Sequence, residues 1–325
     1  MSNDHVKQIL EGSDMATARL ISWLEDEDER ATSIMEEIYS QTGKAYIIGI
    51  TGAPGGGKST LTDKLTRALR KRGQSVGIVA VDPSSPFTGG AVLGDRVRMS
   101  EHNTDPEVYI RSMATRGFLG GMAKATADVV KVLDAAGKDV IIIETVGVGQ
   151  DEVDIVGIAD TVCLVLVPGL GDAIQSMKAG VMEIADIYVV NKADHPGADQ
   201  LYAEVLARVE QDQHIKPMGW TPPVIKTVAV EDLGVDELLQ AIDRHRQYLE
   251  ESGQYLEKRK ERTRRETLRM VHNELFRIVR QRLQDSGRLD RLVEDILDRK
   301  RDPYSTMREI VNKWLCISHN QKEAS

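Results

Sequence analysis

A glycine-rich loop directly after a short apolar run constrains the fold of this sequence most. Residues Ala45–Thr51 are mostly apolar, and the next eight, GAPGGGKS, match the pattern G-x-x-x-x-G-K-[ST]. A helical stretch, Ser59–Lys71, follows. Glycines let backbone N–H groups turn inward around phosphate oxygens, and a helix N-terminus adds its positive end. The loop therefore predicts a phosphate site in which Lys58 reaches the β- and γ-phosphates and the Ser59 hydroxyl binds Mg²⁺.

Six further short apolar runs, rich in valine and isoleucine, follow along the chain, and helix-like stretches separate most of them. They are Ser75–Asp82, Val108–Arg111, Asp139–Glu144, Thr161–Val167, Ile187–Asn191 and Val224–Val228. Unbroken apolar strands are typical of a parallel sheet covered on both faces. We therefore predict an α/β fold, a phosphate-loop domain over residues 43–250 with a mostly parallel sheet flanked by helices. Ligands of such sheets bind at the carboxyl ends of the strands.

Helical patterns flank this domain on both sides. Residues 1–42 predict an N-terminal helical segment, a hairpin packed on the main domain and broken near Gly12 and Glu25–Glu29. Residues 251–325 predict a C-terminal helical extension, with long helices at Glu257–Gln284 and Leu289–Leu315. The apolar stripe of this extension either packs on its own domain or forms a homodimer interface.

A second motif predicts which base is bound. Asn191-Lys192-Ala193-Asp194 follows the run Ile187–Val190 and matches N-K-x-D. The Asp194 carboxylate can accept from both the ring N–H and the exocyclic amine of guanine, whereas adenine offers no such pair of donors. A site built around such a pair rejects the wrong base by about 10⁴–10⁵. Lys192 would lie along the base plane.

The end of the last apolar run is a weaker part of the same prediction. Thr227-Val228-Ala229 either brings a backbone N–H to the guanine carbonyl or simply ends the strand.

Acidic residues at strand ends are candidates for the metal. Glu144 follows one apolar run, where it could hold Mg²⁺ or position water, and Gly147 would offer its N–H to the γ-phosphate. Asp82 ends another run, and Asp95 lies in the loop Ser84–Met99, a candidate switch. Asp95 either binds the metal or caps the following helix. A second candidate moving loop is Val167–Gly180, which otherwise is a plain strand-to-helix connection.

Composition excludes several classes of function. The net charge of −9 disfavours general binding to nucleic acid or anionic membranes. The two cysteines, Cys163 and Cys316, have no metal-ligand spacing and indicate a reducing compartment. The sequence lacks an apolar stretch long enough for a membrane span, and Met1–Leu10 lacks the pattern of a secretory signal. We expect a cytoplasmic protein.

Together these residues resemble the methylmalonyl-CoA mutase-associated GTPases of the MeaB/ArgK type, within the Glu-containing group of phosphate-loop GTPases. The resemblance covers most of the chain. The matching stretches are Gly49–Thr60, Val81–Met99, Ile110–Gly121, Glu144–Glu152, Gln175–Gly180 and Asn191–Asp194.

This resemblance implies a homodimeric G-protein chaperone for an adenosylcobalamin-dependent acyl-CoA mutase. Methylmalonyl-CoA mutase is the expected partner, and isobutyryl-CoA and related mutases stay open. GTP hydrolysis would time cofactor loading and protect the mutase. The family pattern implicates Asp95 and Glu144 in magnesium binding and hydrolysis, and places Lys178 in a third switch. The role of Gln150 stays open.

The predicted site thus has three groups of residues. The predicted catalytic residues are Lys58, Glu144 and Asp95. The predicted metal ligands are Ser59, Asp82, Asp95 and Glu144. The residues predicted to bind GTP or GDP are Gly52, Ala53, Pro54, Gly55, Gly56, Gly57, Lys58, Ser59, Thr60, Gly147, Asn191, Lys192, Asp194, Thr227, Val228 and Ala229.

Two other classes of function remain open from the sequence. A small-molecule kinase would need an acceptor pocket and a base near the γ-phosphate, and the sequence indicates no separate substrate-binding domain. A nickel-insertion GTPase would usually carry cysteine or histidine ligands, whereas the seven histidines here are scattered.

Overall fold

The computed structural model describes residues 2–83, 102, 104–115, 121–145, 157–169, 181–215 and 219–314. The chain divides into two compact units, Met1–Lys258 and Arg259–Ser325. Within the described residues, no helix is both long and apolar enough to cross a lipid bilayer. The division into residues 1–42, 43–250 and 251–325 stays a prediction.

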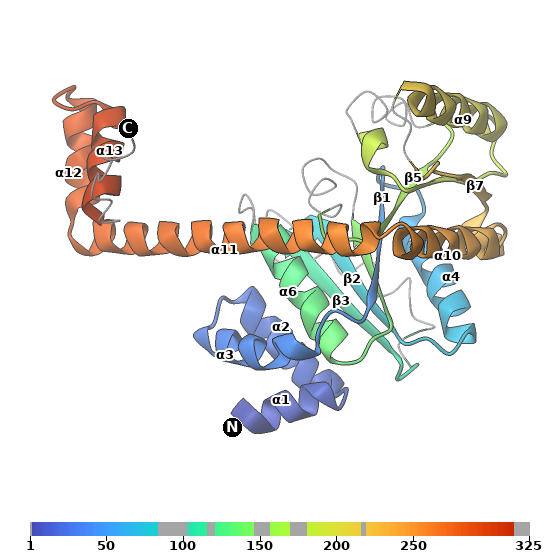
Figure 1. Ribbon diagram of the computed structural model, residues 1–325, viewed down its shortest axis with the longest axis horizontal. Helices are drawn as coiled ribbons and strands as arrows, with labels where there is room; N and C mark the ends of the chain where they lie inside the picture. The colour runs from blue at the N-terminus through green and yellow to red at the C-terminus, as the bar shows by residue number, and fades with distance from the viewer. Residues whose placement is uncertain are drawn as a thin grey trace, which may run out of the picture. The chain divides into compact units, whose positions relative to one another are not determined.

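The first unit is built on one parallel sheet whose described strands number seven (Figure 1). Their order is β3-β2-β4-β1-β5-β6-β7. The strands are β1 (Tyr46–Gly52), β2 (Val76–Pro83), β3 (Val108–Thr115), β4 (Val140–Thr145), β5 (Thr161–Leu166), β6 (Ile187–Asn191) and β7 (Val224–Thr227). Each coincides with a predicted apolar run, so the predicted α/β fold with a parallel sheet is confirmed.

Both faces of the sheet are buried, which explains why the strands are apolar without alternation. In β1, Tyr46, Ile48 and Ile50 pack with the helices of one face, and Ile47 packs with those of the other. One face is covered by α4 (Lys58–Lys71) and α10 (Val235–Glu251). The opposite face is covered by α6 (Gly121–Ala135) and α9 (Ala198–Ile215). Two short 3₁₀ turns, η3 (Val181–Ile184) and η4 (Ala229–Glu231), lie between elements.

The N-terminal segment forms three helices, so the prediction of a hairpin was wrong, although its helical character is confirmed. They are α1 (Ser2–Leu10), α2 (Asp14–Glu25) and α3 (Glu29–Ile38), followed by the 3₁₀ turn η1 (Tyr39–Gln41). The breaks have local causes, because Ser13 caps α2 and Asp28 caps α3 by accepting bonds from backbone N–H groups. The buried sides of these helices pack in the same apolar cluster as α6.

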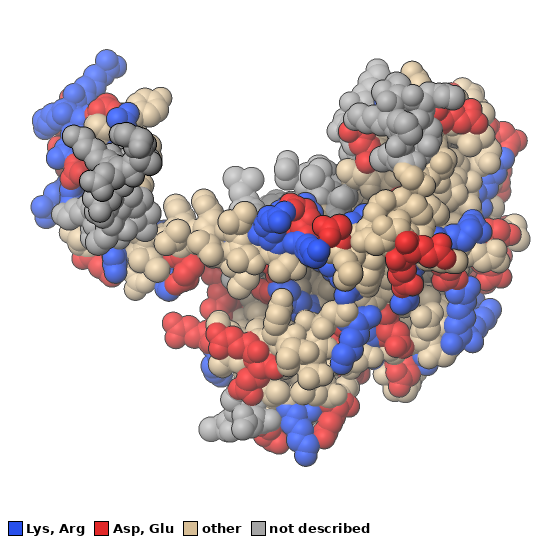
Figure 2. All heavy atoms as spheres, viewed as in Figure 1, with Lys and Arg blue, Asp and Glu red and all other residues tan. Residues whose placement is uncertain are grey.

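The outer surface of the N-terminal helices is acidic. Residues 1–42 hold ten aspartates and glutamates but only three lysines and arginines. Figure 2 shows the red acidic side chains standing out where Figure 1 places α2 and α3. Of the ten acidic residues, Glu25 forms an ion pair with Arg111 of β3, which connects α2 to the edge of the sheet.

The second unit is helical. α11 (Gln254–Asp285) begins in the first unit and continues into the second, where α12 (Arg288–Leu297) and α13 (Pro303–Trp314) follow. A single helix over Leu289–Leu315 was predicted, and this was wrong. Asp302 accepts a bond from the Ser305 N–H at 2.8 Å, so it caps a new helix that starts at Pro303.

Candidate functional site

Three glycines of the loop between β1 and α4 have positive φ, and at two of them, Gly52 and Gly57, a side chain would also clash with its surroundings. Gly52 has φ +138°, and a Cβ there would lie 2.1 Å from the Val165 carbonyl oxygen of β5. Gly57, which precedes α4, has φ +83°, and its Cβ would lie 2.4 Å from Nδ2 of Asn191. The loop is therefore held between the ends of β5 and β6.

Lys58 begins α4 and folds back over this loop. Its side chain is buried, with the residue only 5% exposed. The ammonium donates to the carbonyl oxygens of Gly52 at 2.7 Å and Ala53 at 2.9 Å. These contacts hold a positive charge within the curve of the loop, where an anionic ligand would add to its partners.

Ser59 and Glu144 meet beside the loop, as expected for two ligands of one metal. The Ser59 hydroxyl donates to Oε1 of Glu144 at 2.5 Å. Glu144 lies near the end of β4, opposite Ile50 of β1, and is only 5% exposed. A hydroxyl and a carboxylate are the oxygen donors that Mg²⁺ prefers, so this pair fits such an ion.

Asn191 joins the loop to the second motif. Its Nδ2 donates to the Gly56 carbonyl at 2.8 Å. Its Oδ1 accepts from the Thr227 hydroxyl at 3.0 Å and from the Ala229 N–H at 3.2 Å. One buried carboxamide therefore fixes three chain segments, the loop and the ends of β6 and β7.

The rest of the N-K-x-D motif turns outward from this joint. Lys192 has φ +55°, a left-handed conformation that re-aims the chain after β6. The Ala193 N–H donates to the Thr227 carbonyl at 3.0 Å, so this turn is pinned to β7. The Asp194 side chain is half-exposed and lies 3.7 Å from Nε2 of His195. It is available to accept bonds from a ligand.

Several predicted residues cannot be placed in this site. Asp95, Gly147, Gln150 and Lys178 lie outside the described residues, and Asp82 is described only as backbone in β2. Among the described residues, no group of three or more histidines, cysteines and acidic residues could hold a metal.

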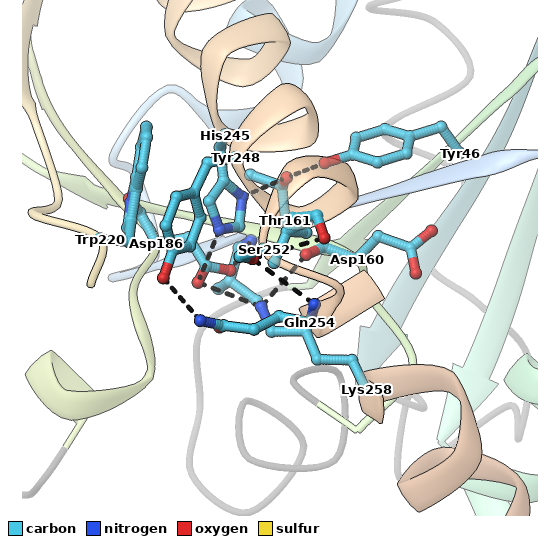
Figure 3. A network of polar contacts seen from close by, with 12 residues as sticks. Tyr46, Asp160, Thr161, Asp186, Trp220, His245, Tyr248, Ser252, Gln254 and Lys258 are labelled. Carbon is cyan, nitrogen blue, oxygen red and sulfur yellow. Dashed lines mark hydrogen bonds and ion pairs between the residues drawn. The ribbon is translucent and has the colours of Figure 1, made fainter. Parts of the chain in front are cut away.

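A second polar cluster, which the sequence did not reveal, lies where β1, β5 and β6 begin, at the opposite end of these strands from the loop (Figure 3). His245 of α10 has Nδ1 at 2.7 Å from the Thr161 hydroxyl and Nε2 at 3.4 Å from Asp186. The Thr161 hydroxyl in turn lies 2.5 Å from that of Tyr46. The order acid, imidazole and hydroxyl is that of a nucleophilic triad. However, Tyr46, Thr161 and His245 are all buried, so no substrate could reach the hydroxyl.

This cluster instead anchors the start of α11. Lys258, in the second turn of α11, lies 3.3 Å from Asp186, and Gln254 donates to the Tyr248 hydroxyl at 2.5 Å. Burial lowers the pKa of the His245 imidazole to about 4, with Lys258 acting in the same direction and Asp186 opposing it. His245 is therefore neutral near pH 7. A lone histidine in an apolar helical stripe gave no signal of these contacts.

Comparison with known proteins now identifies the class. The chain is 50% identical to a predicted GTPase of Pyrococcus abyssi, with 98% of this chain and all of that protein covered. It is 34% identical to the GTPase ArgK of Escherichia coli, over 84% of this chain and 86% of that protein. A crystal structure of a LAO/AO transport system kinase has the same fold, with a TM-score of 0.70, 24% identity and 96% of each chain covered. The class is that of the phosphate-loop GTPases.

The family is narrower than this class. The family model for the methylmalonyl-CoA mutase-associated GTPase MeaB matches residues 17–284. The chain therefore belongs to the MeaB family, as the resemblance predicted.

Proposed function

We propose that this protein binds GTP together with Mg²⁺, hydrolyses it to GDP and phosphate, and acts as a G-protein chaperone of an adenosylcobalamin-dependent acyl-CoA mutase. The observation that carries the nucleotide part is the Asn191 side chain. Asn191 ends β6, and its bonds to the glycine-rich loop, to Thr227 at the end of β7 and to Ala229 support a single site that contains both the phosphate motif and the base motif.

The residues at the loop would bind and orient the phosphates. The backbone N–H groups of Gly52–Thr60 and the Lys58 ammonium would take the triphosphate, because both present positive charge around one curve. Ser59 and Glu144, whose Oγ and Oε1 are hydrogen-bonded at 2.5 Å, would hold Mg²⁺. We propose Asp82 and Asp95 as further ligands of this ion. When bound, Mg²⁺ neutralises charge on the phosphate oxygens. Lys58, Glu144 and Asp95 are the proposed catalytic residues, with Gly147 donating to the γ-phosphate.

The residues after β6 would select guanine. Asp194 would accept from the ring N–H and the amine, and Lys192 would lie along the base plane. The backbone of Thr227, Val228 and Ala229 forms the end of β7 and the residues just after it, beside Asn191, where an N–H would reach the guanine carbonyl. Asp194→Asn tests this assignment, because an amide donates where the carboxylate accepted. Preference should move from GTP toward XTP, whereas an unchanged preference would contradict it.

The mutase part rests on the family. Its description names an association with methylmalonyl-CoA mutase, which is our proposed partner. In this role GTP hydrolysis would gate cofactor loading and protect the mutase, and the protein would work in the cytoplasm.

We also propose that residues 251–325 form a homodimer interface. In the second unit, α11 exposes Leu268, Val271 and Leu275 at helical spacing, more than 40% exposed each. Analytical ultracentrifugation should give twice the monomer mass. The triple substitution of these residues by serine should give a folded monomer.

Phosphate release tests the reaction. Wild-type protein with GTP and Mg²⁺, with no acceptor added, should release phosphate, faster when purified methylmalonyl-CoA mutase is present. Lys58→Ala is the matched control and should release none. No release, even with the mutase, would favour the alternative of a small-molecule kinase. Nickel bound by the purified protein would favour a nickel-insertion GTPase.

A further inference from the structure

Two buried threonines face each other directly beneath the loop. β1 and β4 pair in parallel with Ile50 opposite Glu144, which puts Thr51 and Thr145 next along the two strands. The Thr145 hydroxyl donates to the Thr51 hydroxyl at 3.0 Å. Thr51 is 0% exposed and Thr145 is 1% exposed, so neither hydroxyl exchanges with bulk water.

The chain neighbours of this pair are the two sides of the proposed metal site. Thr51 is followed by Gly52, which lies so close to the carbonyl of Val165 that no side chain fits there. Thr145 is preceded by Glu144, whose carboxylate accepts from Ser59 at 2.5 Å. The hydroxyl bond therefore links the start of the loop to the strand that carries the metal-binding carboxylate.

Stability alone does not account for two hydroxyls in this place. A buried hydroxyl loses its bonds to water, and one bond within the protein roughly offsets that loss. Valine has nearly the shape of threonine, and replacing both partners of a buried bond by apolar groups of the same shape is close to neutral. A valine pair would thus hold the strands together as well, but would not fix the two strand ends by a directional bond.

We propose that Thr51 and Thr145 are positioning residues for the Mg²⁺ end of the nucleotide site. Their bond keeps the end of β4, and with it Glu144, beside Ser59, so that these two side chains would hold the ion. Without it, the end of β4 can shift relative to the loop, and displacements below 1 Å already weaken metal binding and slow catalysis. This inference rests on the proposed function, since it assigns the pair to the same GTP and Mg²⁺ site.

The decisive variant is the double substitution Thr51→Val with Thr145→Val. Its Tm should stay within about 2 °C of wild type, whereas each single substitution, which leaves one hydroxyl alone, should lower Tm by about 2–4 °C. The Mg²⁺ concentration that half-saturates binding of a fluorescent non-hydrolysable GTP analogue should rise about threefold or more. GTP turnover at saturating nucleotide should fall about tenfold.

Two controls separate positioning from general damage. Thr145→Ser keeps the hydroxyl, so this variant should have the Mg²⁺ dependence and the turnover of the wild type, unlike Thr145→Val. Thr126→Val replaces a buried threonine of α6 and should change neither.

Each outcome decides the matter. A double variant with wild-type Mg²⁺ dependence would overturn the positioning role, and so would a double variant that loses as much Tm as the two single variants together. If wild-type protein neither binds the GTP analogue nor releases phosphate, the proposed function fails first, and this inference fails with it.

Discussion

His245 makes folding stability depend on pH in a way that can be calculated. In the folded protein burial lowers its pKa from 6.5 to about 4. The unfolded chain therefore takes up a proton between these two values while the folded protein does not. The stabilisation is fully present above about pH 6.5 and is lost as the pH falls toward 4. A shift of about 2.5 units corresponds to about 3 kcal/mol, of which about 2 kcal/mol is lost between about pH 7.5 and about pH 5.

The hydrogen bonds around the ring give the physical reason. Asp186 is a carboxylate acceptor, so Nε2 carries the proton, and Nδ1 accepts from the Thr161 hydroxyl. Thr161 then accepts from Tyr46, whose pKa burial raises so far that the phenol stays protonated. Protonation of Nδ1 would turn this acceptor into a second donor and break the chain of bonds. The ammonium of Lys258, 3.3 Å from Asp186, also disfavours a positive charge on His245.

A nearby tryptophan provides the assay. The ring of Trp220 lies 4.8 Å from that of His245, and the other two tryptophans, Trp23 and Trp314, can be replaced by phenylalanine. Urea unfolding, followed by Trp220 fluorescence at about pH 7.5 and about pH 5, should give the loss of about 2 kcal/mol. His245→Gln, which cannot titrate, should lack this part of the loss. An equal pH dependence in both proteins would refute the argument.

Three further predictions concern the loop and the metal ligands. Gly57→Ala should abolish binding of a GTP analogue in a titration, because its Cβ would lie 2.4 Å from Asn191; normal affinity would mean that the loop has another shape. Lys58→Met should lower affinity for GTP more than for GDP, since the ammonium is predicted to reach the γ-phosphate; an equal loss would contradict that reach. Glu144→Gln should spare nucleotide binding but slow phosphate release by about 10²-fold or more in single-turnover assays; an unchanged rate would make Glu144 structural.

The strands of the sheet and their parallel direction could be predicted from the sequence, but their order was not predicted. Its strands are buried on both faces, so each is a short uninterrupted apolar run, and Gly52 and Asn191 mark where two of them end. The helices outside the domain were less predictable. The apolar spacing beyond Leu289 continues past the turn before Pro303, whereas the left-handed backbone of Arg299 (φ +56°) and the cap formed by Asp302 divide the helix there.

The candidate site, too, has residues that the sequence predicted and contacts that it did not. The motifs predicted Ser59 and Glu144 as ligands of one metal, because a hydroxyl at the start of a helix and a carboxylate at the end of a strand can each bind Mg²⁺. The contact of Asn191 with Gly56 depends on how closely the ends of β1 and β6 approach across β5, which the spacing of residues along the chain does not encode. The same is true of His245 and Asp186, which meet only because α10 packs across the start of β6.

The Asn191 carboxamide has a consequence for how such a protein can evolve. Its amide NH₂ bonds to the glycine-rich loop and its oxygen to the end of β7. In the proposed site these two segments would contact the phosphates and the base, so a substitution of Asn191 that relaxed base selectivity would also weaken phosphate binding. A lineage that changed its preferred base would then be expected to do so through Asp194, for which no such bond to the loop is described.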